Sequence, residues 1–559
     1  MNIGRPARGV EEAVLPGGRN SERLPRQVVT LAFLSDQIPS PFLSSQLSAS
    51  LCAETGAETV LVRLQAQEGG SENAARLAPE PFLNGEFHYP PELQRAPAGF
   101  YILALGVRSE PPTVAGIESL IGQLTRRFRH VLIETRVSEI PEAWFFELVE
   151  RSDFAYVFLN TTTEGIYHLD LVMQGERARH GQAVIKPVGC LGEGEQIDGF
   201  DLLAQKVAAP MHMFVRGCPK TDSPETKQQT PSSAIFRADV RRLAREVGGR
   251  LTGLALSSGA AKGFAHIGVI QVLEENGIEV DVVAGASMGA YVGALWAFGH
   301  NGREMEELAR QLEGRWALWS LVDPVFPPRR GFLGGFAMKK RLMRTIGNAR
   351  FADLVRPLRI VAANLATLER KVFCSGEVAS AVHASIAVPG ICVPITLEGE
   401  TYVDGGIVDP LPVEILRDMG AARVIAVDVI PTPDRIRYGL EAERELARHN
   451  REKRWRLLRR ALPSDELNYF ACGNLFDILM RCLHGSQIRV AAASWPLADL
   501  VLRPDICDDS WLDYRHPGKF IALGREAAER HLQEIKSLMA RKEAGLPEQA
   551  AIPMAIAVG

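Results

Sequence analysis

Two short segments of the chain combine residue types that could perform nucleophilic chemistry. Segment 285–289 reads Gly-Ala-Ser-Met-Gly, and the pattern G-x-S-x-G presents a serine at a turn from a strand into a helix. The hydroxyl of Ser287 needs a base at neutral pH, and Asp404, followed by Gly405 and Gly406, ends the strand-like segment TYVD. Burial would raise the pKa of that carboxyl and make it a better proton acceptor. The DGG segment alone is equally typical of an Asx turn that only caps structure.

The stretch 282–299, VVAGASMGAYVGALWAFG, is uncharged and fits two different structures. Gly285, Gly289 and Gly293 have the G-x-x-x-G spacing of a transmembrane helix dimer. Alternatively, Gly285 and Gly289 permit the close backbone contacts of a tight strand-to-helix turn. The apolar segment before Ser287 and the helical pattern after it favour the second interpretation, which predicts a buried strand followed by a buried helix.

A loop of small residues, SSGAAKG at 257–263, lies between the strand-like segment TGLAL and an apolar helix pattern. Backbone N–H groups that converge at the start of a helix favour an anion. The loop alone leaves open whether this anion is a phosphate or the oxyanion of a reaction intermediate. Only one helix and one strand separate the loop from Ser287, so both are expected at the same carboxyl edge of a parallel sheet.

Four segments occur in a fixed order along the chain: LALSSGAAKGFAHIGVIQVLEENGI, GASMGAYVGALWA, ASIAVPGICVPI and YVDGGIVDPLPVEILRDMGAARVIAVDV. Together they resemble the patatin-like phospholipases, in the bacterial branch related to neuropathy target esterase. The resemblance extends over residues 250–430, with a further match at 498–535. It implies a serine hydrolase on an α/β sheet with a Ser–Asp dyad and no histidine, in which Ser287 is the nucleophile and Asp404 the general base.

The same resemblance places the oxyanion motif of the family, G-G-G-x-[RK]-G, on six consecutive residues: Ser258, Gly259, Ala260, Ala261, Lys262 and Gly263. It implies that N–H groups of the first four, Ser258 to Ala261, bind the oxyanion. Ser258 and Ala260 replace two of the three leading glycines, so a stiffer loop is expected. Lys262 is expected either to hold the helix and loop together or to present its charge to a phosphate head group.

A Ser–Asp–His triad is a competing arrangement, because that chain order occurs in the α/β-hydrolases. The candidate histidines are His266, His383, His449, His484 and His516, of which the last three follow that order. None of them lies in a motif of its own, and His266 fits the first turn of a helix. Asp409 and Asn364 depart from the family pattern and are expected to be structural.

The N-terminal half predicts a second α/β unit. Apolar strand-like segments such as QVVTLAFLSD, AETVLVRLQ and FAYVFLNTT alternate with helical segments, which indicates a doubly wound Rossmann-like sheet. The layout resembles that of the MinD/ParA-like P-loop ATPases. The corresponding loop, LSDQIPSPFLSS, lacks the glycines and lysine of a P-loop, and Glu134 stands where an Asp is expected. We therefore expect a degenerate P-loop without nucleotide chemistry and no cofactor.

These patterns predict a domain layout. It comprises a disordered tail (1–26), the Rossmann-like domain (27–215), a linker and helix (216–248), the patatin-like core (249–430), a C-terminal helical region that completes the catalytic domain (431–540), and a tail (541–559). The arginines of the helical segment 234–249 are expected on a solvated surface. A basic segment at 441–464 and an apolar one at 467–485 fit either a membrane-surface element or a solvated helix and a core helix.

Composition limits the classes of function. The formal charge of −4 argues against attraction of the whole chain to nucleic acid. The eight cysteines contain no C-x-x-C pair, so we expect reduced thiols, no metal, and a cytoplasmic protein. The predicted function is hydrolysis of phospholipid or lysophospholipid acyl esters, with peripheral contact at the inner membrane face left open. A noncatalytic lipid- or protein-binding scaffold and a carboxylesterase for small substrates remain as alternatives, and the sequence does not indicate an oligomeric state.

Overall fold

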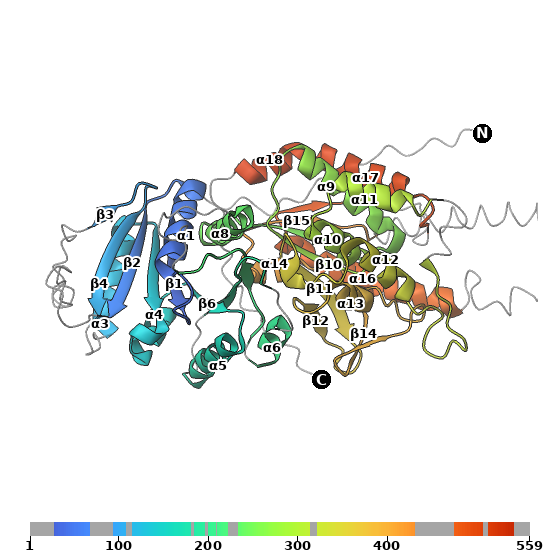
Figure 1. Cartoon of the computed structure of the whole chain (residues 1–559). Coiled ribbons are helices and arrows are strands. Elements are labelled where there is room, and N and C mark those ends of the chain that lie inside the picture. Colours follow the sequence, from blue (N-terminus) through green and yellow to red (C-terminus); the bar gives the residue numbers. More distant parts are fainter. Residues whose placement is uncertain are drawn as a thin grey trace, which may run out of the picture.

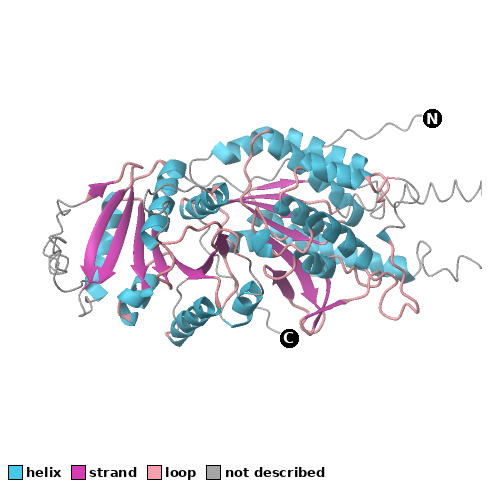
Figure 2. Ribbon diagram, viewed as in Figure 1, coloured by secondary structure: helices cyan, strands magenta, loops and turns pink. Residues whose placement is uncertain are grey.

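The computed structural model describes ten stretches of the chain: residues 27–66, 93–107, 114–179, 184–195, 200–207, 209–221, 233–313, 321–430, 475–506 and 513–540. Within them the chain forms two eight-stranded sheets, and helices cover the faces of both (Figure 1). Figure 2 shows the two sheets as separate magenta layers between cyan helices. The predicted α/β class is confirmed.

The N-terminal sheet has the strand order β3-β4-β2-β5-β1-β6-β7-β8. All neighbouring pairs are parallel except β3 with β4. The strands are β1 (Gln27–Phe33), β2 (Thr59–Ala66), β3 (Gln94–Arg95), β4 (Tyr101–Val107), β5 (His130–Arg136), β6 (Phe154–Asn160), β7 (Ile185–Cys190) and β8 (Met213–Val215). Because helices cover both faces of a parallel sheet, its strands are apolar almost throughout, as β6 illustrates.

Helices connect these strands and cover the sheet. They are α1 (Ser40–Thr55), α3 (Val114–Arg127), α4 (Glu142–Glu150), α5 (Thr163–Ala178) and α6 (Phe200–Val207), with a 3-10 turn, η1 (Val137–Glu139). At the start of α1, the buried carboxylate of Glu134 accepts hydrogen bonds from Ser44 Oγ (2.5 Å) and Arg63 Nε (2.8 Å). Both donors to the Glu134 carboxylate are thus side chains of the N-terminal α/β unit itself.

The second sheet has the order β13-β14-β11-β10-β9-β15-β16, and β12 pairs with β11. Its strands are β9 (Thr252–Leu256), β10 (Val282–Ala286), β11 (Leu358–Asn364), β12 (Arg370–Phe373), β13 (Ile395–Leu397), β14 (Glu400–Asp404), β15 (Arg423–Val427) and β16 (Leu500–Leu502). Neighbouring strands in the series β11-β10-β9-β15-β16 are parallel, whereas β12, β13 and β14 form antiparallel pairs.

The helices around this sheet are α9 (Ala265–Glu275), α10 (Met288–Phe298), α11 (Gly302–Arg310), α12 (Phe336–Ile346), α13 (Val378–Ser385), α14 (Val413–Asp418), α16 (Leu475–Ser494), α17 (Pro517–Arg530) and α18 (Leu532–Ala540). Four 3-10 turns join them: η2 (Ala260–Phe264), η4 (Phe351–Asp353), η5 (Gly405–Ile407) and η7 (Trp495–Leu497). Helix α17 crosses α9 at very short range, where a Cβ on Gly268 or Gly524 would collide with the opposite backbone. A stretch after residue 431 therefore packs directly onto the helix that follows the loop at 257–263.

Helices α1 and α8 (Ala234–Val247) lie between the two sheets (Figure 1) and share one hydrophobic core with both. The expectation that the arginines of this helix lie on a solvated surface is wrong for Arg242 and Arg245, which are buried. Arg242 bonds to Asp239 at 2.8 Å, and Arg245 bonds to Asp281 at 2.9 Å. The carboxylates neutralise the guanidinium groups, which makes their burial tolerable.

The stretch 282–299 forms strand β10 and helix α10, each almost entirely buried. In the part of the chain that the structure describes, no helix combines the length and apolarity that a membrane crossing requires. The transmembrane interpretation of this stretch is therefore wrong, because its apolar residues face the protein core. The predicted tails at 1–26 and 541–559 and the basic segment 441–464 lie outside the described residues.

Candidate active site

Ser287 occupies the turn between β10 and α10, with φ 53° and ψ −121°. A non-glycine residue at positive φ is strained, and such strain persists only where the surroundings enforce it. The two flanking glycines make the turn possible. A Cβ on Gly285 would lie 2.6 Å from the backbone of Gly289, and a Cβ on Gly289 would collide with the carbonyl oxygen of Leu256.

Asp404 is the last residue of β14 and lies beside Ser287. The Ser287 hydroxyl donates a hydrogen bond of 2.6 Å to Asp404 Oδ2. The other carboxylate oxygen, Oδ1, accepts the N–H of Gly406 at 2.7 Å. A Cβ on Gly405 would collide with the carbonyl oxygen of Val361 in the neighbouring strand β11. The DGG segment thus lets the carboxylate approach the serine turn closely.

The carboxyl of Asp404 is 3% exposed. Burial raises its pKa from 3.8 to about 6, although the hydrogen bonds from Ser287 and Gly406 act in the opposite direction. The predicted upward shift is confirmed. A carboxylate with a pKa near 6 is ionised at neutral pH and is a stronger base than a solvated one, as general base catalysis requires.

Ser385, the last residue of α13, contacts the serine turn, and the sequence patterns did not indicate this role. Its hydroxyl accepts a hydrogen bond from the backbone N–H of Ser287 at 2.8 Å and donates one to the carbonyl oxygen of Val361 at 2.6 Å. Ser385 is fully buried and ties the serine turn to strand β11. The sequence shows Ser385 only as a polar residue within the apolar segment ASIAVPG. Ser287, to which it bonds, lies 98 residues away in the chain.

In the loop before α9, one of the four N–H groups that were expected to bind an oxyanion already has a partner. The N–H of Ser258 already donates to the carbonyl oxygen of Pro410 at 2.8 Å, which corrects the expectation that it faces an oxyanion. Gly259 is the N-cap of the 3-10 turn η2, and Ala260 and Ala261 begin that turn, where the first N–H groups of a helix are left without intrahelical partners. Ala260 has φ 47°, so the alanine occupies a left-handed conformation that favours glycine.

The rest of the loop is buried against the serine turn and α16. Lys262 is buried, and a Cβ on Gly263 would lie 2.5 Å from Met288 Cγ. Burial lowers the pKa of His484 on α16, and the charge of Lys262 lowers it further. Gln487, also on α16, lies so close to Gly406 that a Cβ there would be 2.7 Å from its Nε2. Helix α16 therefore covers the junction of the loop and the DGG segment.

None of the described histidines bonds to Ser287 or Asp404. His266 Nε2 lies 2.9 Å from the carbonyl oxygen of Ser257, and burial lowers its pKa to about 4. His383 bonds to the carbonyl oxygen of Gly334, and His516 bonds to Asp513. His449 lies outside the described residues.

The two residues that depart from the family pattern have structural partners. Asp409 pairs with Arg370 at 2.9 Å. Asn364 Oδ1 accepts the backbone N–H groups of Ala366 and Thr367, at 2.8 and 3.2 Å, in the turn that follows β11. In the stretches that the structure describes, no group of three or more His, Cys, Asp or Glu side chains has an arrangement that could hold a metal ion.

Comparison with known proteins adds a family assignment for part of the chain. Residues 254–417 match the family model described as patatin-like phospholipase. The lysophospholipase nte1 of Aspergillus fumigatus is 34% identical over 206 residues, which cover 36% of this chain and 14% of that protein. The lysophospholipase nte1 of Aspergillus niger is 29% identical over 332 residues, 58% of this chain and 20% of that protein. The chain thus spans a small part of the length of these relatives.

Two solved structures match part of the chain. A chain of the MinC:MinD cell division protein complex of Aquifex aeolicus matches 40% of this chain and 96% of its own length, with 14% identity and a TM-score of 0.32. VipD from Legionella pneumophila covers 51% of this chain and 67% of its own, with 16% identity and a TM-score of 0.27. Both TM-scores are low, and the strand order and register define the fold.

The matched range contains the serine turn, the loop at 258–263 and the DGG segment. The structure brings these three segments together at one edge of the second sheet. Residues 254–417 of this chain therefore resemble the patatin-like phospholipases, as the four sequence segments predicted.

Proposed function

We propose that this chain is a serine hydrolase that cleaves fatty acyl esters of phospholipids or lysophospholipids. The observation that carries the proposal is the buried contact of 2.6 Å between Ser287 Oγ and Asp404 Oδ2. The relatives named lysophospholipase, of which the chain spans only a part, support the class of substrate.

In the first step Asp404 accepts the hydroxyl proton of Ser287, and Oγ attacks the ester carbonyl. The N–H groups of Gly259, Ala260 and Ala261 are the proposed donors to the oxyanion. Because such donors are fixed before the reaction, they stabilise developing charge without reorganisation. The protonated Asp404 then returns its proton to the leaving alcohol, and the acyl group remains on Ser287.

In the second step Asp404 takes a proton from a water molecule, which attacks the acyl-serine ester. The tetrahedral intermediate collapses, the fatty acid leaves, and Ser287 recovers its proton from Asp404. The same carboxylate serves both steps, so no histidine is needed. Its pKa of about 6 suits both directions of proton transfer near neutral pH.

The test is labelling of the purified chain by a fluorophosphonate, together with release of fatty acid from lysophosphatidylcholine. We expect both reactions in the wild type and neither in Ser287→Ala or Asp404→Asn. Ser380→Ala is the matched control, because Ser380 lies on the same helix as Ser385 but bonds to Glu377 and to Lys339 of α12. Failure of the wild type to label or to release fatty acid would overturn the proposal in favour of a noncatalytic scaffold.

A second assay separates a lipid hydrolase from a carboxylesterase. Rates on short p-nitrophenyl esters and on lysophospholipid are compared in the same preparation. We expect the larger kcat/KM on the lipid, since binding energy from a long acyl chain can be used in the transition state. A larger kcat/KM on the short ester would contradict the proposed lipid substrate and favour a carboxylesterase for small substrates.

A further inference from the structure

One loop of the second domain exposes large apolar side chains to solvent. We call residues 322–336, which read VDPVFPPRRGFLGGF, the aromatic loop. Phe326 is 94% exposed and Phe336 is 65% exposed, and Val322, Val325 and Phe332 are also exposed. Because soluble proteins rarely gather exposed apolar residues in one place, such a patch indicates an interaction surface.

The aromatic loop is held in a defined shape. A bridge pairs Pro324 with Leu333, and the N–H of Val325 donates to the carbonyl oxygen of Phe332 at 2.9 Å. Asp323 Oδ2 accepts the N–H of Phe336 at 2.8 Å. These bonds connect the two arms of the loop and leave residues 326–331 as its tip. The loop is the yellow-green segment at the lower right of Figure 1.

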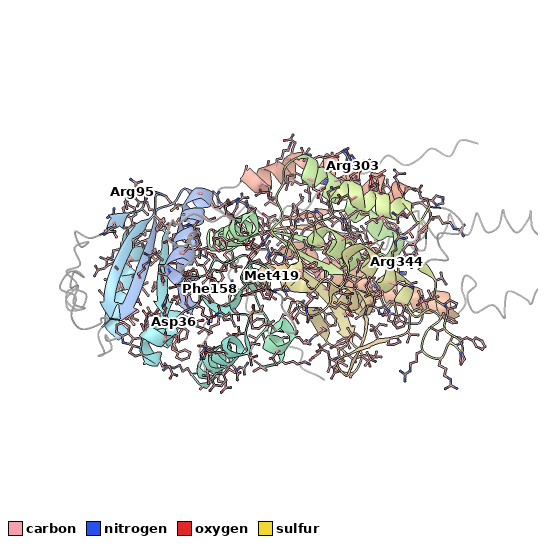
Figure 3. The ribbon with its side chains drawn as sticks, viewed as in Figure 1. Asp36, Arg95, Phe158, Arg303, Arg344 and Met419 are labelled. Atoms are coloured by element: carbon pink, nitrogen blue, oxygen red, sulfur yellow. The ribbon has the colours of Figure 1, made fainter. Side chains whose placement is uncertain are left out.

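The charge of this surface is opposite to that of the whole chain. Arg329 and Arg330 lie exposed between Phe326 and Phe332, and Lys340 and Arg344 are exposed on the adjoining helix α12. Arg344 is labelled at the right of Figure 3, where the loop also projects. The loop's acidic side chain, Asp323, is bonded to the start of α12. The surface is therefore aromatic and basic in a chain of formal charge −4.

A short hydrogen-bonded segment links this surface to the candidate dyad. The carbonyl oxygen of Ile391 accepts the N–H groups of Phe332 and Leu333, at 2.8 and 2.9 Å. In the same segment, the carbonyl oxygen of Ala387 accepts the N–H of Asp404 at 2.9 Å. The aromatic loop and the backbone of Asp404 are thus both hydrogen-bonded to one segment, residues 386–393.

We propose that the aromatic loop and the exposed basic residues of α12 dock the chain on an anionic phospholipid surface. The inference rests on the proposed function, because it places the membrane beside the dyad that would act on its lipids. Phenylalanine side chains insert at the boundary between head groups and acyl chains, and arginine and lysine are attracted to anionic lipids. The combination of an apolar tip with flanking cations fits a leaflet better than it fits an apolar protein groove.

The experiment measures partitioning of the full chain onto sedimented vesicles of phosphatidylcholine with or without phosphatidylglycerol. The Ser287→Ala protein is used throughout, so that lipid is not consumed. Arg329→Ser with Arg330→Ser is expected to lower partitioning on the anionic vesicles roughly 25-fold, at about five-fold per cation, and to have no effect on neutral vesicles. Phe326→Ala is expected to lower it about ten-fold, whereas Phe326→Trp retains it.

Tyr167→Ala is the matched control, because Tyr167 is an aromatic residue 60% exposed on α5 of the other domain. It should leave partitioning unchanged, and thermal unfolding verifies that every variant is folded. Unchanged partitioning of both loop variants would overturn the proposal. So would a dimer in solution that Phe326→Ala converts to monomer, because a second copy would then cover the patch.

These experiments can contradict the docking surface and the hydrolase independently of each other. Vesicle binding that needs the aromatic loop, in a chain that fluorophosphonate does not label, would retain the docking surface and remove the hydrolase. Labelling by fluorophosphonate, without vesicle binding that depends on the aromatic loop, would retain the hydrolase and remove the docking surface. Because binding is measured in the Ser287→Ala background, neither result depends on turnover.

Discussion

The hydroxyl of Ser385 accepts the backbone N–H of Ser287 at 2.8 Å and so supports the strained turn that carries the candidate nucleophile. Ser385→Ala would leave that buried N–H without a partner. We expect a loss of about 1–3 kcal/mol in the free energy of unfolding. We also expect a fall in kcat of roughly 10- to 100-fold, because small displacements of a nucleophile are costly. Denaturant unfolding and lysophospholipid turnover measure the two effects.

Ser380→Ala on the same helix is the control for this prediction, since its hydroxyl bonds to Glu377 and Lys339 instead. A Ser385→Ala variant with the turnover of the wild type would show that the turn does not need this hydrogen bond.

The pH dependence of kcat/KM should report Asp404 of the free enzyme. The reaction needs the ionised carboxylate, and burial raises its pKa to about 6. The rate is therefore expected to rise with pH, to reach half of its maximum near pH 6, and to level off above it. Steady-state rates on a neutral ester between pH 4.5 and about 9 measure the profile. A half-maximum close to 4, the value for a solvated carboxyl, would contradict the assignment.

The same carboxyl should lower the stability of the fold at neutral pH. Its pKa is 3.8 unfolded and about 6 folded, so between these values the folded state binds more protons and stability falls as pH rises. The cost above the folded pKa is about 3 kcal/mol, at about 1.4 kcal/mol per pKa unit. Asp404→Asn removes the charge, and its amide oxygen can accept the Gly406 N–H while its NH2 group donates to Ser287 Oγ.

We therefore expect Asp404→Asn to be inactive yet more stable than the wild type at pH 8, by up to about 3 kcal/mol, with the difference shrinking toward pH 4. Denaturant unfolding at both pH values provides the measurement. A variant less stable than the wild type at pH 8 would show that the hydrogen bonds to the carboxylate outweigh its burial.

The loop at 258–263, which contains the proposed oxyanion donors, offers a matched pair of substitutions. A Cβ on Gly259 would collide with Val429, so Gly259→Ala should displace the loop and reduce kcat about 100-fold, the effect of losing one oxyanion donor. Ala260→Gly relieves a left-handed φ of 47° but adds freedom to the unfolded chain. These effects oppose each other, so stability should change by less than about 1 kcal/mol, with activity retained.

Fluorophosphonate labelling rates and thermal unfolding of both variants are the readouts. A strong loss of labelling in Ala260→Gly, with its fold intact, would mean that the stiffness of the alanine is itself required for the reaction.

Several sequence predictions depend on neighbours in the chain, and these agree with the structure. The G-x-S-x-G turn needs glycine on both sides of Ser287 because the backbone of β10 and α10 crosses within a few residues. The alternation of strands and helices likewise follows from local patterns of apolar residues. The partnership of Ser287 with Asp404 came from the family resemblance, because the two residues are 117 positions apart.

By itself, then, the sequence determined the strand-to-helix turn at Ser287, the small-residue loop before it, and the α/β class of both halves. Only the tertiary structure decided that Ser385 supports the turn, that the N–H of Ser258 is bonded to Pro410, and that Arg242 and Arg245 are buried. It also decided that the aromatic loop stands beside the segment that holds Asp404. The physical reason is the same in each case. Turn geometry and apolar periodicity are set by adjacent residues, whereas the partner of a buried polar group is set by which distant strands and helices the fold brings together.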